Sequence, residues 1–141
     1  MRSVAALRAL SRADRRLLFD AVIASAFFRL ALYFFALERL RGWAARPGRG
    51  DRPVDRIVWA IEAATRRVPA TTCLSSALAL QRLLGANGHE SELHIGVAKT
   101  AGAFAAHAWV ERDGRVLFGE SERDAYVPLA SWPSDARTHR G

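Results

Sequence analysis

Residues 69–120, the stretch that decides the fold, read PATTCLSSALALQRLLGANGHESELHIGVAKTAGAFAAHAWVERDGRVLFGE. The first part has apolar residues at helical spacing, and Cys73, the only cysteine of the chain, lies at the expected start of that helix. The remainder alternates apolar and polar residues, the pattern of half-buried strands. Asp113-Gly114 between two such runs is typical of a two-residue hairpin turn. Helices followed by antiparallel strands predict an α+β fold in which the cysteine helix packs on a β-meander.

The hairpin turn predicts which residues of its two strands face each other. Counting outward from Asp113-Gly114 gives the pairs Glu111 with Val116, Val110 with Leu117, Trp109 with Phe118, and His107 with Glu120. Directly opposed side chains share a face, with Cβ atoms roughly 4.5–5.5 Å apart. We therefore expect the Glu120 carboxylate to orient the His107 imidazole. Trp109 and Phe118 are expected to wall the same site against water and to contact substrate.

Cys73 is the candidate nucleophile of this site. In the first turn of a helix, unpaired N–H groups and the positive end of the helix dipole stabilise a thiolate. With His107 as base and Glu120 as the orienting acid, the three residue types fit acyl-enzyme chemistry. Each has a purely structural alternative as well: a core cysteine, a histidine bonded to a backbone carbonyl, and a solvated glutamate. Other candidates for the acid are Glu111, Glu122 and Asp124.

Composition limits the class of protein and its partners. A chain of 141 residues predicts one domain, or one domain with an appendage. One cysteine excludes an internal disulfide framework and fits the reducing cytoplasm. The net charge of +7 invites anionic partners, but no nucleic-acid motif is present, so we expect no nucleic-acid partner. The four histidines have no zinc-ligand spacing, so we expect no metal.

The N-terminal part predicts one long apolar helix from Ala13 to Arg41. Its middle, 17–37, is long enough to cross a bilayer. Asp20 and Arg29 within that stretch argue against a lipid-facing span. We expect this helix to meet the core, a partner protein or a membrane surface.

The chain is expected to divide into three regions. Gly42 to Pro53 is rich in glycine, proline and arginine and is predicted to be a linker. It separates an apolar helical region over 1–42 from a catalytic domain over 51–132. Residues 133–141 lack core-forming side chains and predict a flexible tail.

The segments CLSSALALQRLLG (73–85) and HAWVERDGRVL (107–117) together resemble the transglutaminase-like cysteine peptidases of lasso-peptide biosynthesis, which remove the leader from a precursor peptide. The helical N-terminal half and AYVPL (125–129) extend the resemblance over most of the chain. It implies a papain/transglutaminase-like core with Cys73 as nucleophile, His107 as base and Glu120 as third member, where many relatives have aspartate. It implies no cofactor.

The same resemblance implies partners. We expect no separate leader-binding domain in this chain, so a small leader-recognition protein is expected to present the precursor's leader, with the lasso cyclase as a further partner. Two other functions stay open at this point. A transglutaminase-like acyl transferase or deamidase could use the same three residues, because fold does not decide the reaction. A non-catalytic adaptor could act through the apolar helix, and it would tolerate Cys73→Ala.

Overall fold

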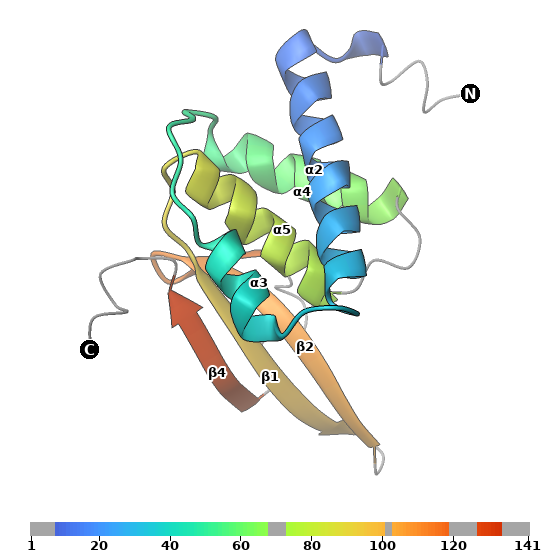
Figure 1. Ribbon diagram of the computed structural model, residues 1–141, viewed down its shortest axis with the longest axis vertical. Helices are drawn as coiled ribbons and strands as arrows, with labels where there is room; N and C mark the ends of the chain where they lie inside the picture. The colour runs from blue at the N-terminus through green and yellow to red at the C-terminus, as the bar shows by residue number, and fades with distance from the viewer. Residues whose placement is uncertain (1–7, 68–72, 101–102, 119–126, 134–141) are drawn as a thin grey trace.

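Four helices, α2 to α5, precede a four-stranded antiparallel sheet in the part of the chain that the structure describes (Figure 1). The computed structural model describes residues 8–67, 73–100, 103–118 and 127–133. The helices are α2 (Arg12–Ala31), α3 (Leu37–Ala44), α4 (Val54–Arg67) and α5 (Cys73–Ala86). The strands are β1 (Glu92–Thr100), β2 (Ala103–Arg112), β3 (Arg115–Phe118) and β4 (Val127–Pro133). The predicted α+β class, with a helical region at the N-terminus and an antiparallel sheet after it, is confirmed.

The single helix predicted from Ala13 to Arg41 is wrong, because the chain turns between α2 and α3. The turn, 32–36, contains neither glycine nor proline, so no local breaker ends α2. Packing explains the break. Leu40 of α3 is fully buried, and the ring of Trp43 lies 6.0 Å from that of Phe27. A straight helix would hold α3 away from these contacts, and tertiary packing therefore overrides helix propensity.

The segment between α3 and α4 is packed along the end of α5. The predicted linker over 42–53 is shorter than expected, because α3 runs through its first residues. The N–H of Gly48 donates to the carbonyl of Gly85 at 3.0 Å, and that of Gly50 to the carbonyl of Ala86 at 2.9 Å. A Cβ at Gly48 would overlap the backbone of Ala86. Glycine therefore allows a close approach here that fixes α3 and α4 against α5.

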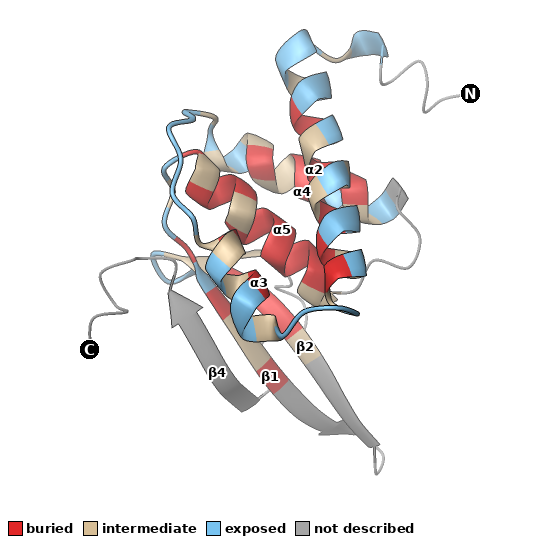
Figure 2. Ribbon diagram, in the orientation of Figure 1, coloured by how far each residue is buried: buried red, intermediate tan, exposed pale blue. Residues whose placement is uncertain are grey.

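Helix α5 forms the centre of the core. Ten of its 14 residues are buried, and Figure 2 shows it red along most of its length. Buried residues of α2, α4 and the sheet surround it in one hydrophobic cluster: Leu17, Ala21, Phe28, Ile57, Ile61, Leu93, Ala108 and Val110. Helix α2, from the predicted N-terminal region, thus shares its core with the helix that begins at Cys73.

The sheet has the order β3-β2-β1-β4. Strands β1, β2 and β3 form the predicted antiparallel meander, and β1 pairs with β2 without a break from Glu92 opposite Glu111 to Thr100 opposite Ala103. Strand β4 does not extend the meander beyond β3. It returns to the other side of β1 and pairs with it antiparallel. Its prolines suit this edge position, since an edge strand does not need every N–H for pairing.

Helix α2 also has an exposed apolar face. Among the described residues, seven large hydrophobic side chains in and just after α2 are at least 40% exposed: Phe19, Ile23, Phe27, Leu30, Tyr33, Phe34 and Phe35. We call this surface the apolar ridge; its helical part includes the pale blue stripe along α2 in Figure 2. Within the described residues, no helix combines the length and the apolar character that crossing a membrane requires.

Substituting alanine at two aromatic positions tests whether α2 belongs to the core. Phe28 is 2% exposed, so Phe28→Ala should lower the free energy of unfolding by about 3–5 kcal/mol. Phe34 is 73% exposed, so Phe34→Ala should change it by less than about 0.5 kcal/mol. Urea unfolding measures both. Equal effects would contradict the burial of α2.

Candidate functional site

Cys73 is the first residue of α5, as the sequence predicts. The first turn of this helix contains no acidic residue to oppose a thiolate. The side chain is partly exposed, carries a free thiol and packs against the hydrophobic core. Cys73 therefore combines the helix-start position of a nucleophile with partial access to solvent.

Helix α5 is held in place by polar contacts as well as by its apolar cover. One turn after the cysteine, the buried Ser76 hydroxyl lies 3.1 Å from that of Thr65 on α4. Thr65 also donates to the carbonyl of Ile61 at 2.8 Å. These contacts fix the beginning of α5 against α4, so the position of Cys73 is set by packed elements rather than by a loop.

His107 lies in the middle of β2, opposite Gly96 of β1. Its ring stacks on that of Trp109, with centroids 6.3 Å apart and planes 21° apart. Alternation along the strand puts these two residues on one face. Ala108 and Val110 point the other way, into the helical core. The structure thus brings His107 together with Trp109, on the sheet face turned away from the hydrophobic cluster.

Cys73 and His107 lie on two elements, α5 and β2, that pack against each other. His107 lies on the face of β2 turned away from the hydrophobic cluster against which Cys73 packs, so the described part of the chain does not bring the imidazole to the thiol. The pairing of Cys73 with His107 thus stays a prediction.

The predicted hairpin turn is confirmed, but the register beyond it is wrong. Asp113 and Gly114 have φ values of 51° and 79°, the left-handed conformations that this two-residue turn requires. The register then shifts, so that Val110 pairs with Phe118 instead of Leu117. The shift is a bulge, and both Leu117 and Phe118 pack against the hydrophobic core. A regular strand would turn one of them away from it.

The bulge changes what the register predicts for the rest of the site. Phe118 pairs with Val110 and does not oppose Trp109. The prediction that Trp109 and Phe118 form an opposed pair beside the site is therefore wrong. Trp109 itself is 2% exposed. The count that placed Glu120 opposite His107 no longer holds, because it assumed a regular strand. Glu120 lies outside the described residues, as do the alternatives Glu122 and Asp124.

A second polar group was missed from sequence. Glu92, His94 and Glu111 gather on the same sheet face as His107, with one ligand atom of each within 4.8 Å of the others. Glu92 and His94 have the two-residue spacing of one strand face, which is visible in the sequence. Glu111 joins them only through the pairing of β1 with β2, which a search for ligand spacing along the chain does not detect.

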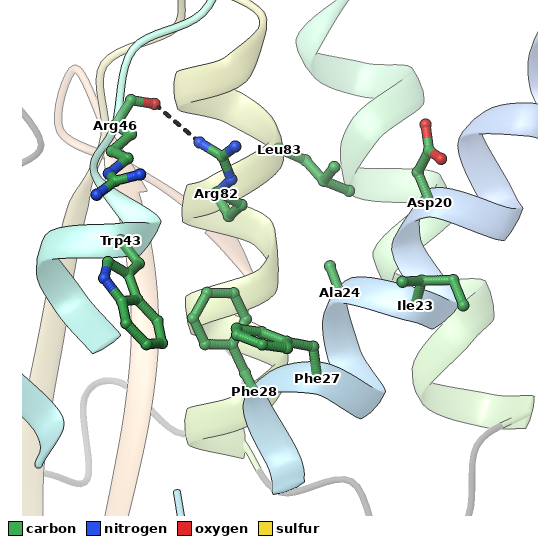
Figure 3. Close-up of a pocket in the computed structure, with 9 residues that line it drawn as sticks. All are labelled: Asp20, Ile23, Ala24, Phe27, Phe28, Trp43, Arg46, Arg82 and Leu83. Atoms are coloured by element: carbon green, nitrogen blue, oxygen red, sulfur yellow. Dashed lines mark hydrogen bonds between the residues drawn. The ribbon is translucent and has the colours of Figure 1, made fainter. Parts of the chain in front are cut away.

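A pocket of about 490 Å³ opens between α2, α3 and α5. The rings of Phe27, Phe28 and Trp43 line it, as Figure 3 shows. Arg46 and Arg82 stand at one side, where Arg82 donates to the Arg46 carbonyl at 3.3 Å. The pocket adjoins the apolar ridge, because Ile23 and Phe27 belong to both. Asp20 also lines the pocket and pairs with Arg52 at 2.9 Å. Arg46 and Arg82 are thus the cations on its other side that a carboxylate could contact beside an apolar side chain.

The chain matches a known protein family over most of its length. The family model described as Transglutaminase-like superfamily matches residues 15–131. This range includes all four helices and all four strands except the first three residues of α2 and the last two residues of β4. Comparison with curated proteins and comparison with solved structures found no match.

Substituting Trp109 tests the hydrogen bond that this buried ring makes. Its Nε1–H donates to Glu111 Oε1 at 3.1 Å. Trp109→Phe keeps an aromatic ring for stacking but removes the donor to a carboxylate, and should lower the free energy of unfolding by about 1–3 kcal/mol. Trp59→Phe, at a partly buried position on α4, is the control. Urea unfolding measures both variants. If Trp109→Phe lowers the free energy of unfolding no more than Trp59→Phe does, the hydrogen bond to Glu111 does not stabilise the fold.

Proposed function

Because the chain belongs to the Transglutaminase-like superfamily, whose catalysis is generally cysteine-dependent, we propose that it is a cysteine endopeptidase that removes the leader from a lasso-peptide precursor. The observation that carries the proposal is the position of Cys73. The only cysteine of the chain is the first residue of the central helix, and that helix packs against the strand bearing His107. The resemblance of 73–85 and 107–117 to leader peptidases supports the choice of substrate.

In the proposed mechanism, Glu120, the third member that the resemblance implies, orients His107, and the imidazole takes the proton of the Cys73 thiol. The thiolate attacks the scissile carbonyl, and the tetrahedral intermediate collapses when His107 protonates the departing amine. Water, deprotonated by His107, then attacks the thioester. This releases the new carboxyl end and returns the proton to the thiol. Every proton is thus carried by His107, and these steps use no cofactor.

The apolar ridge supports a partner in this function. Contiguous exposed apolar surface of this kind marks interaction sites in many proteins. The adjoining pocket adds Arg46 and Arg82 to its aromatic rings. We assign the ridge to a small leader-recognition protein that inserts an apolar side chain and contacts the arginines with a carboxylate. The lasso cyclase and a membrane surface are the other occupants to be tested.

The reaction class is tested by product mass. Wild-type protein, incubated with precursor and the leader-recognition protein, should release free leader and free core peptide. Cys73→Ala should abolish release while leaving the unfolding free energy within about 1 kcal/mol, because the change removes only the thiol. A cross-linked product would favour acyl transfer, a product about 1 Da heavier would favour deamidation, and full activity of Cys73→Ala would favour an adaptor.

Substitutions on the ridge test the partner assignment. Ile23 and Leu30 are 53% and 61% exposed, so Ile23→Ser/Leu30→Ser should keep the fold. Processing of full precursor with its recognition protein should fall about tenfold or more. Iodoacetamide modification of Cys73 should proceed at the wild-type rate.

The control is Glu62→Ser, an exposed position on α4 away from the ridge, which should process precursor normally. Unchanged processing by the double variant would contradict docking on the ridge. Loss of binding to anionic vesicles, with processing intact, would assign the ridge to a membrane surface instead.

A further inference from the structure

Glu92, His94 and Glu111 converge on the sheet face that does not pack against the helical core. Glu92 and His94 are on β1, and Glu111 lies directly opposite Glu92 on β2. His94 Nε2 is 3.3 Å from Glu92 Oε2 and 3.4 Å from Glu111 Oε2. Two carboxylates from neighbouring strands therefore meet at one imidazole nitrogen.

The contacts at this nitrogen do not have the geometry of hydrogen bonds. Nε2 is buried from solvent and has no hydrogen-bond partner among the described residues, although both oxygens are close. Ligand atoms held roughly 2.0–2.2 Å from a tetrahedral metal ion lie about 3.3–3.6 Å apart. The two nitrogen–oxygen separations match this spacing. A cation between the three atoms would also relieve the repulsion of two adjacent carboxylates.

Neighbouring groups hold two of the three side chains in position. The His94 ring stacks on Trp109, with centroids 5.5 Å apart and planes 7° apart. Trp109 also donates its indole N–H to Glu111 Oε1, while Oε2 of the same carboxylate faces His94. Such outer contacts orient the ligands of metal sites. The Glu92 side chain is 54% exposed, so solvent and ions reach the cluster from its side.

We propose that Glu92, His94 and Glu111 bind a divalent transition-metal ion, with Zn²⁺ the best match. One imidazole nitrogen with two carboxylate oxygens is a ligand set that Zn²⁺ accepts, whereas Mg²⁺ and Ca²⁺ prefer oxygen alone. The ion joins β1 to β2 and reinforces the strand pair that carries His107. The alternative occupant of the same position is a proton on His94, forming an imidazolium between the two carboxylates.

Calorimetric titration of the metal-free full chain with Zn²⁺ tests the site. Wild-type protein should bind one equivalent, and Glu92→Gln should weaken binding about tenfold or more, since it removes one ligand at a largely exposed position. At zinc concentrations near 100 times Kd, the thermal midpoint should rise by about 9 °C in wild type and much less in Glu92→Gln. Co²⁺ bound in the same place should show visible absorption bands that the variant weakens.

Two controls separate this site from other ligands of the chain. Glu38→Gln, at an exposed position on α3, and Cys73→Ala should both bind Zn²⁺ as wild type does. His94→Gln should bind more weakly than either. Zinc binding weaker than millimolar, binding unchanged in Glu92→Gln, or binding lost in Cys73→Ala would each overturn the proposal and leave the protonated imidazole as the occupant.

Discussion

Helix α5 needs apolar cover on nearly every side, and this constraint organises the rest of the fold. Its small and branched side chains present almost no polar face, so the helix is stable only when other elements exclude water from it. Helices α2, α3 and α4 cover one side, and β1 and β2 cover the other. Cys73 and Leu74 at the beginning of the helix are partly exposed, as are Arg82 and Ala86 further along it, whereas the ten buried residues fill the rest. The middle of α5 thus forms the core, whereas its first residue, the candidate nucleophile, keeps access to solvent.

Features that depend on neighbouring residues could be predicted from the sequence. The helix start at Cys73, the alternation of β1 and β2, and the turn at Asp113-Gly114 follow from local conformational preferences and were confirmed. Features that depend on distant contacts could not. The end of α2 results from the packing of α3, and the bulge after Val116 results from two successive apolar residues that both reach the core.

The same distinction applies to the candidate site. A nucleophile at a helix start is a local feature, and so is a histidine on an alternating strand. Glu120, the third residue of the predicted site, was placed by counting residue pairs along β2 and β3 from the hairpin turn. A single inserted residue in one strand changes every pair beyond it, so such a count fails after a bulge. The cluster around His94, in contrast, could be found only in the structure. Its residues are unremarkable along the chain, and only the pairing of β1 with β2 brings them to one place.

The position of β4 has a consequence for the order in which the sheet is completed. Strand β1 lies inside the finished sheet, yet its second neighbour is the last described strand of the chain. During translation, β2 and β3 leave the ribosome first, and β1 keeps a row of unpaired N–H and C=O groups along one side until β4 emerges. Such an open edge is a template for pairing with other chains. A chain that lacks the residues from 127 onward would therefore present this open edge of β1 to other chains.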